Sequence, residues 1–231
     1  MFYGIDYYYF ILVIPALIIA AYAQMKVSSN FNKYSRAATR SGLTGAGAAR
    51  RILDMNGLQN VSIEHISGNL TDHYDPRTNT VRLSDNVYNS QSIAAVGVAA
   101  HETGHAVQHA TGYIPLKARN AIIPITNFGS KLAMPLIILG MFFSVTLIKV
   151  GIVLFATVVV FQLITLPVEF NASHRAVATL DSMGVVDDVE KSGVKKVLTA
   201  AALTYVAALL VSIAQLLRLV LIYGRRNKGE W

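Results

Sequence analysis

Two histidines four positions apart, with a glutamate beside the first, are the residues best suited to metal chemistry. His101, Glu102 and His105 form the pattern H-E-x-x-H within the stretch AHETGHA. On a helix, residues four apart lie on one face, so both imidazoles can reach one Zn²⁺ ion. Zinc lowers the pKa of a bound water to about 7, and Glu102 is placed to take the proton from that water. The spacing therefore predicts a zinc centre that hydrolyses peptide bonds.

A catalytic zinc ion usually has a third protein ligand and one open position. One longer version of the motif requires glycine at position 108 and histidine at position 111, and the chain has Gln108 and Thr111 there, which excludes it. The alternative ligand is a glutamate from a later helix, and the later glutamates are Glu169, Glu190 and Glu230. A carboxylate at the end of an apolar run needs a partner. We therefore predict Glu169 as the third ligand; the competing interpretation is a solvated boundary charge.

The composition places these residues in a membrane protein. Of the 231 residues, 53% are hydrophobic and only 14% are charged, whereas soluble domains have about 25% charged residues. Four apolar runs, at 7–25, 132–148, 150–168 and 197–223, have about the length that crosses a bilayer as a helix. Two of them separate the motif from Glu169, and an even number of crossings returns the chain to the side that it left. The three ligands can therefore meet.

The runs divide the chain into five segments. They are an N-terminal transmembrane anchor (1–25), a polar catalytic domain with the motif helix (26–130), a transmembrane helical hairpin (131–168), a third-ligand helix and connector (169–196), and a C-terminal transmembrane helix with a basic tail (197–231). A cleaved signal peptide competes with the anchor, but its start would carry Lys or Arg, and MFYGID has neither. The basic tail leaves open that the last run lies along the interface.

The polar domain is predicted to contain two helices and a small β-sheet, so the fold class is mainly α. Thr44 is a suitable N-cap for a helix that stops at Asn56-Gly57, and residues 90–110 form the helix that carries the motif. Residues 61–66 and 80–84 alternate like strands on either side of a turn. Strand 80–84 either pairs with an extended substrate through its edge or serves as scaffold.

Several other residues have two interpretations each. His109 lies about 80° from the ligand face of the helix, which favours a supporting or structural role over a fourth ligand. His174 or Arg175 either stabilises the oxyanion that forms as water attacks or is a surface charge. Asp72 and His73 either border the cleft or stabilise the turn that follows them.

Composition also limits the partners. The chain has no cysteine, which excludes disulfides and thiolate metal sites. A net charge of +7 would indicate nucleic acid in a soluble protein, but here the basic residues flank apolar runs, as they do at the inner rim of a membrane. The predicted partners are therefore the lipid bilayer and protein or peptide substrates near its surface, and no nucleic acid. An oligomer or a regulatory membrane partner stays open.

The distribution of Lys and Arg predicts the orientation, because positive charge marks the cytoplasmic ends of spans. No Lys or Arg precedes the first run. The segments that share a face with the motif carry most of them: Lys26, Lys33, Arg36, Arg40, Lys117, Arg119, Lys131, Arg175, Lys191, Lys195 and Lys196. The opposite face has Lys149 and, if the last run crosses, the basic tail. We expect a multi-pass protein of the plasma membrane with its active site on the cytoplasmic face.

The chain resembles a known family, the YugP-like bacterial membrane zinc metallopeptidases. The resemblance covers nearly the whole length and rests on LTDHYDPR (70–77), HETGHAVQHA (101–110) and LPVEF (166–170). It implies a zincin-like, gluzincin-type endopeptidase of the inner membrane. The E-x-x-A spacing from Glu169 to Ala172 is also similar to that of the membrane heat-shock and prenyl-protein proteases, whose third ligand is a glutamate. Two positions depart from the pattern: Asn171 stands where aspartate is expected, and His174 where arginine is expected.

A second class of function stays open beside the peptidase. A membrane scaffold or chaperone-like partner would keep the zinc site without proteolytic turnover, and zinc content combined with a cleavage assay separates the two. A transporter is less favoured, because transporters carry ionisable groups deep in their spans. The first three runs have none, and Arg218, near the end of the fourth, can extend its side chain to the interface.

Overall fold

The protein was described from a computed structural model, which places residues 6–223. Within that range the chain forms two compact units. The first, here called the span unit, contains residues 6–23, 118–166 and 204–223. The second, here called the site unit, contains residues 24–117 and 167–203.

Four helices of the described chain are long and apolar enough to cross a membrane, which confirms the predicted number of spans. They are α1 (Ile14–Tyr34, preceded by the π-helical turn Tyr9–Val13), α5 (Ile114–Phe143), α6 (Val145–Ser182) and α7 (Asp188–Tyr223). Each extends past its predicted apolar run at one end or at both, because polar residues next to the runs continue the same helix. The last run lies within one continuous helix of 36 residues, α7, which is long enough to cross a bilayer.

The break between α5 and α6 falls five residues earlier than predicted, at Ser144 instead of Lys149. The Ser144 hydroxyl accepts a hydrogen bond from the backbone N–H of Thr146 and so begins α6. Gly140 allows the tight turn, since a Cβ there would lie 2.6 Å from the backbone nitrogen of Ile148. Lys149 is exposed in the first turns of α6, where its side chain reaches solvent without ending the helix.

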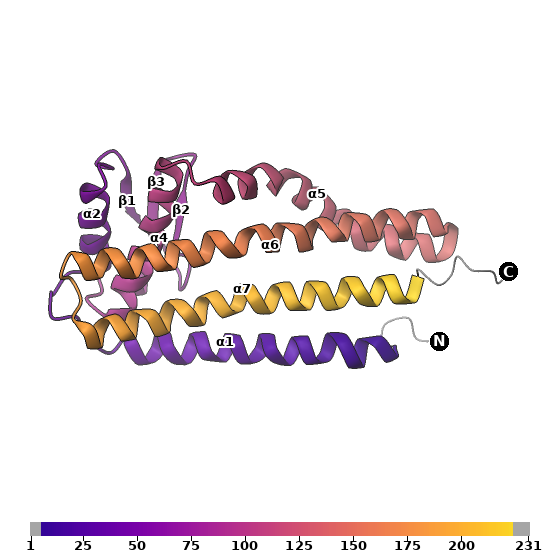
Figure 1. Cartoon of the computed structure of the whole chain (residues 1–231), viewed down its shortest axis with the longest axis horizontal. Helices are drawn as coiled ribbons and strands as arrows, with labels where there is room; N and C mark the ends of the chain where they lie inside the picture. Colours follow the sequence, from indigo (N-terminus) through magenta and orange to yellow (C-terminus); the bar gives the residue numbers. More distant parts are fainter. Residues whose placement is uncertain (1–5, 224–231) are drawn as a thin grey trace. The chain divides into compact units, whose positions relative to one another are not determined.

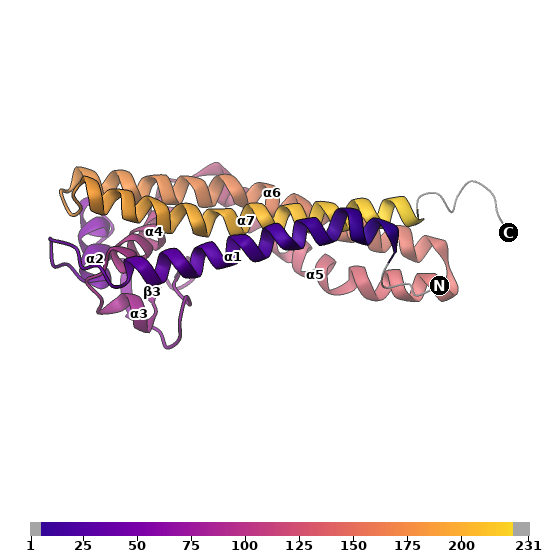
Figure 2. The same cartoon turned by 90° about the horizontal axis from the view of Figure 1, so that it is seen from below.

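In the span unit, the start of the chain is held to the end of α7 by an ion pair. Arg218 was expected to reach the interface, but it is buried, and its Nη2 and Nε lie 2.6 Å and 2.8 Å from Asp6 Oδ2. Its guanidinium also lies 5.2 Å from the centre of the Tyr9 ring. Val13 packs in one cluster with Ala214 of α7, and Figure 2 shows α1 beside α7.

The first helix of the site unit, α2 (Gly45–Met55), begins and ends where the sequence predicts. The Thr44 side chain accepts a hydrogen bond from the Gly47 N–H at 3.0 Å, which satisfies a backbone donor that the helix leaves unpaired. Gly57 follows the helix with φ +70°, a conformation that favours glycine. Figure 1 shows α2, the strands and α4 (Ile93–Ala110) gathered beside the end of α6.

The sheet has three strands in the order β1-β3-β2, which decides between the two interpretations of strand 80–84 in favour of the scaffold. β1 (Ser62–His65) pairs parallel with β3 (Thr80–Leu83), and β2 (His73–Asp75) pairs antiparallel with it. β3 is therefore central, and both its edges are already paired, so it cannot add a substrate strand. The sequence did not predict β2, because three residues are too few to show an alternating pattern.

The hairpin from β2 to β3 is held by Asp75. Its Oδ1 accepts a hydrogen bond from the Arg77 N–H at 2.9 Å, and its Oδ2 lies 3.1 Å from Arg82 Nη1. These contacts, with a hydrogen bond from Thr78, lower the pKa of Asp75 to about 2. The carboxylate therefore stays charged at physiological pH and fixes the turn.

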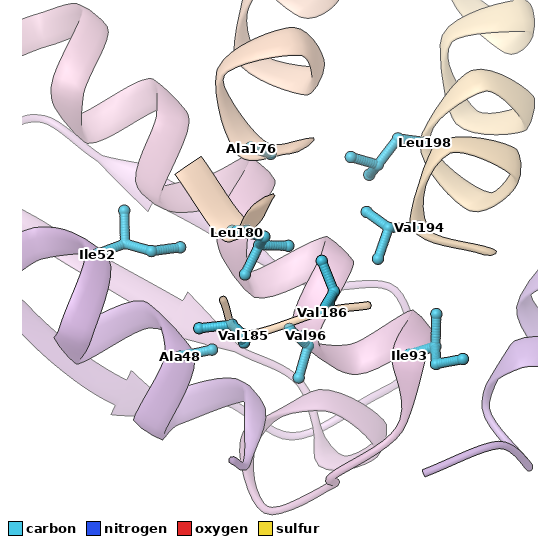
Figure 3. Packing of buried hydrophobic residues seen from close by; sticks show 11 residues of the cluster. Ala48, Ile52, Ile93, Val96, Ala176, Leu180, Val185, Val186, Val194 and Leu198 are labelled. Carbon is cyan, nitrogen blue, oxygen red and sulfur yellow. The ribbon is translucent and has the colours of Figure 1, made fainter. Parts of the chain in front are cut away.

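Helix α4 runs through the apolar centre of the site unit. It begins at Ile93, three residues later than predicted, because the Ser92 hydroxyl accepts from the Ala95 N–H and caps it. One side of α4 packs against the sheet and the short helix α3 (Asp85–Tyr88). The other side meets the cluster in Figure 3, which joins α2, α4, α6 and α7 through Ala48, Ile52, Ile93, Val96, Ala100, Ala176, Leu180, Val185, Val186, Val194 and Leu198. This packing fixes α4 against the helices that complete the site.

Candidate metal centre

The side chains of His101, His105 and Glu169 come together in the site unit, as the sequence predicts. Glu169 Oε2 lies 3.3 Å from His101 Nε2 and 3.5 Å from His105 Nε2. The three side chains are only 14%, 12% and 5% exposed. Two ligands placed about 2.1 Å from a zinc ion at a tetrahedral angle are about 3.4 Å apart. The observed separations therefore match two edges of a zinc tetrahedron.

The approach of α4 to α6 depends on Gly104. A Cβ at this position would lie 2.9 Å from the carbonyl oxygen of Ala172 and 3.3 Å from its Cα, whereas favourable carbon contacts are about 3.5–4.0 Å. Ala172 is itself fully buried. Gly104 stands next to His105, and Ala172 is one turn beyond Glu169. Two small residues at the crossing therefore set the distance between the imidazoles and the carboxylate.

Gln108 fixes the orientation of the His105 ring. Its amide nitrogen donates to the carbonyl of Val168 at 2.8 Å and to Asn171 Oδ1 at 3.0 Å. With both N–H groups used, its Oε1 faces His105 Nδ1 at 3.0 Å, and since an amide oxygen only accepts, Nδ1 carries the proton. The lone pair on Nε2 of His105 is therefore available to a metal. Gln108 is fully buried, so this bridge between α4 and α6 lies out of reach of solvent.

Ser173 orients the His101 ring in a similar way. Its hydroxyl lies 3.1 Å from His101 Nδ1 and can accept that proton, which again leaves Nε2 for the metal. Hydrogen bonds of this kind to a metal-ligating histidine set its tautomer and ring orientation. Ser173 comes one turn after Glu169 on α6. The same helix therefore supplies one side chain of the cluster and forms a hydrogen bond with another.

Asn171 and Arg175 form a second link within α6. Arg175 Nε donates to Asn171 Oδ1 at 2.8 Å, and the same oxygen accepts from Gln108. The family resemblance implies an aspartate at position 171. The amide oxygen of Asn171 accepts both of these hydrogen bonds, so the link between α4 and α6 does not require a carboxylate. The Arg175 guanidinium is thus engaged with Asn171, whereas His174 is exposed.

The remaining predicted residues have structural positions. His109 Nδ1 lies 2.8 Å from the hydroxyl of Tyr74 on β2, and His109 lies outside the ligand group. This contact ties the end of α4 to the sheet, in agreement with the structural interpretation. Asp72 accepts hydrogen bonds from the N–H and hydroxyl of Ser84, and His73 Nδ1 lies 2.8 Å from Thr71 O. Both therefore stabilise the turn region.

Burial and the neighbouring groups have opposite effects on the pKa of His105. Burial lowers the pKa of its imidazole, but the hydrogen bond to Glu169 and the negative charges of Glu102 and Glu169 outweigh burial, so the pKa is raised. The half-buried Glu102 is therefore close enough to act on His105 electrostatically. A site that favours a protonated imidazole also favours a metal cation in the same place.

The donor set fits zinc. Two imidazole nitrogens and one carboxylate oxygen are a common ligand set of catalytic zinc, with a fourth position left for water. These three side chains were predicted from the sequence, whereas the contacts of Gln108 and Ser173 with the histidines were not. Their signal is spacing: Gln108 stands three residues after His105, and Ser173 four residues after Glu169. Either residue is then on the same helix face as a ligand.

Comparison with known proteins agrees with this chemistry. A family model described as "Putative neutral zinc metallopeptidase" matches residues 9–224. The chain is also 55% identical over 214 residues to the "Putative membrane protease YugP" of Bacillus subtilis (strain 168), which covers 92% of this chain and 95% of that relative. No solved structure matches the chain. These two matches show that the chain belongs to this family of neutral zinc metallopeptidases, and the His-His-Glu cluster and the four helices of membrane-spanning length agree with it.

Proposed function

We propose that this protein is a membrane endopeptidase in which His101, His105 and Glu169 hold a zinc ion and Glu102 is the general base. The observation that carries the proposal is that Glu169 Oε2 lies 3.3 Å from His101 Nε2 and 3.5 Å from His105 Nε2. These separations agree with two edges of a zinc tetrahedron in a largely buried setting. The name of the Bacillus relative, a membrane protease, supports the same class of reaction.

The chemistry follows from the arrangement of the protein's own groups. When bound, zinc would polarise the scissile carbonyl and lower the pKa of a water molecule to about 7. Glu102 would take the proton from that water and pass it to the leaving amine, a role that requires a carboxylate within hydrogen-bond reach of both. Gln108 and Ser173 would keep both imidazoles in the tautomer that presents Nε2.

The proposed substrates are polypeptides at the membrane surface, on the cytoplasmic side. Glu169 follows directly on the apolar run of α6, at 150–168. The chemistry would therefore take place close to the level at which that run leaves the bilayer. The excess of Lys and Arg in the segments of the site unit supports the cytoplasmic side.

A Glu102→Gln substitution tests the mechanism. The variant should keep its zinc, because both imidazoles and Glu169 remain, and should lose cleavage of fluorescein-labelled casein by about 100-fold or more, because the proton acceptor is gone. Glu64→Gln is the matched control, since the Glu64 side chain is 54% exposed and lies on β1.

Two outcomes would contradict the proposal. Cleavage retained by Glu102→Gln would exclude Glu102 as the base. A wild-type protein that binds one zinc ion and cleaves nothing would favour the alternative of a scaffold that keeps its metal site without turnover.

A Glu169→Ala substitution tests the third ligand and should lower zinc occupancy strongly. Glu190→Ala is an unsuitable control, because it would also disturb the fold. The buried Glu190 carboxylate accepts hydrogen bonds from the N–H groups of Arg40 and Asp187. Glu64→Ala is therefore the better comparison. Equal zinc content in Glu169→Ala and Glu64→Ala would show that the third ligand lies elsewhere.

The orientation can be tested by cysteine labelling, because the chain contains no cysteine. Single Ser67→Cys and Thr146→Cys variants would place one thiol in the site unit and one at the turn between α5 and α6, both at exposed positions. In intact cells, a membrane-impermeant maleimide should label position 146 and leave position 67 unlabelled until the cells are opened. The reverse pattern would place the active site outside the cytoplasm.

A further inference from the structure

A groove of about 460 Å³ lies between α6 and α7 within the site unit. Phe170, Ser173 and Val177 line it from α6, and Lys195, Leu198 and Ala202 line it from α7. Its size is that of a site for a small molecule. The mechanism proposed above uses Ser173 from this groove, through its hydrogen bond with His101, and none of the other lining residues.

The two ends of the groove differ in polarity. Phe170 and Ala202 line the end from which α6 and α7 continue into their apolar runs. Asp181 and Lys191 line the other end, close to the connection between the two helices. A molecule with an apolar chain and a charged head matches this gradient, with its chain directed toward the bilayer.

The lysines at the groove determine which charge the head group of a bound molecule should carry. Lys191 Nζ lies 3.0 Å from Asp181 Oδ1 and 2.9 Å from Asp188 Oδ1, so its charge is compensated. Lys195 is exposed one turn nearer the apolar run. A second groove, of about 320 Å³, shares Lys195 and adds Lys196. The positive charge that remains lies just before the apolar run that begins at residue 197, where lipid head groups are found.

We propose that the groove between α6 and α7 binds an anionic phospholipid, with the start of an acyl chain against Phe170 and Ala202. Its phosphate lies between Lys195, which lines this groove, and Lys196, which lines the adjoining one. A peptide occupant is disfavoured, because only side chains of two helices line the groove and no strand edge offers backbone hydrogen bonds to an extended chain. Since Ser173 lines the groove and also lies 3.1 Å from His101 Nδ1, the bound lipid is next to a residue that holds a metal ligand.

The test measures lipid binding to the full-length protein in phosphatidylcholine nanodiscs, with fluorescent phosphatidylglycerol as the probe. A Lys195→Gln/Lys196→Gln variant should bind it about tenfold to thirtyfold more weakly, because each interfacial lysine contributes about 1 kcal/mol to binding an anionic lipid. Lys33→Gln/Arg36→Gln removes the same charge at exposed positions near the end of α1 and should bind almost as the wild type does.

A second variant tests the groove apart from its charge. Ala178 is exposed and lines the groove, so Ala178→Trp should fill it and weaken binding with every lysine intact, while zinc content reports correct folding. An equal loss of lipid binding in Lys195→Gln/Lys196→Gln and in Lys33→Gln/Arg36→Gln would show general attraction to surface charge and overturn the proposal. Displacement of the lipid by an equimolar amount of inorganic phosphate would also overturn it, because the occupant would then be free phosphate. So would groove variants that change casein cleavage and leave lipid binding unchanged, because the occupant would then be a peptide.

Discussion

Replacing Gly104 with alanine should weaken zinc binding more than it weakens the fold. A Cβ at this position would lie 2.9 Å from the Ala172 carbonyl oxygen, about 0.5 Å inside a favourable contact. The obstacle is backbone, so α4 and α6 must separate by roughly that amount. Zinc–ligand distances tolerate only about 0.2 Å. The separation acts one turn from Glu169 and should therefore disturb the site directly.

The expected magnitudes follow from the same geometry. Misplacing a ligand's support lowers metal affinity about 10- to 100-fold. Overpacking costs about 1–3 kcal/mol of folding free energy, but alanine gains back about 1 kcal/mol over glycine within a helix. The free energy of unfolding should therefore fall by about 2 kcal/mol at most. Competition with a chromophoric zinc chelator measures the affinity, and thermal unfolding in detergent measures the stability.

Gly97→Ala is the matched control on the same helix. Its Cβ would meet a Val194 methyl group at 3.1 Å, which is a side chain on α7 that can move by a few tenths of an ångström. Zinc affinity should therefore stay within about twofold of the wild type, well below the 10-fold or greater loss from a ligand whose support has moved. If Gly104→Ala binds zinc as tightly as Gly97→Ala does, the crossing at Gly104 does not set the ligand separation, and the reasoning is wrong.

Three further predictions concern the supports of the site and of the spans. Gln108→Leu leaves the His105 Nδ1–H without its acceptor and should lower zinc affinity about tenfold or more in the chelator assay; an unchanged affinity would show that Gln108 does not position the ring. Asp6→Asn removes the charge that faces Arg218. It should lower the free energy of unfolding by about 1–3 kcal/mol and leave zinc affinity unchanged, because a buried charge loses its partner. Unchanged stability with weaker zinc binding would show that this ion pair does not stabilise the spans. Removing zinc from a solution that holds it at 100 times its Kd should lower the free energy of unfolding by about 2.7 kcal/mol and leave the far-ultraviolet circular dichroism nearly unchanged, whereas a loss of helix would show that the metal is needed for the fold.

The sequence predicted the elements whose signals are local. Thr44 marked the start of α2 and Gly57 its end, because capping and positive φ depend on single residues. The two histidines of the candidate metal centre on α4 were evident from their four-residue spacing. Glu169 could be chosen because few glutamates follow the motif and because the count of spans brings the chain back to the same side.

The features that the sequence did not predict depend on contacts between distant segments. Strand order placed β3 in the centre of the sheet, which no single strand pattern shows. Arg218 was assigned to the interface because Asp6 lies 212 positions away in the chain. The bridging role of Gln108 needs Val168 and Asn171 of another helix. Tertiary pairing, and not local propensity, decides each of these features.

The division of the ligands between two helices has a consequence for biosynthesis. His101 and His105 are synthesised before α5 and α6, and Glu169 follows only after both apolar runs. A nascent chain that stops short of Glu169 offers two imidazoles, one fewer ligand than a catalytic zinc site usually has. On the proposed function, the hydrolytic centre would be complete only once the hairpin has been synthesised, and a chain that has not reached Glu169 would lack peptidase activity.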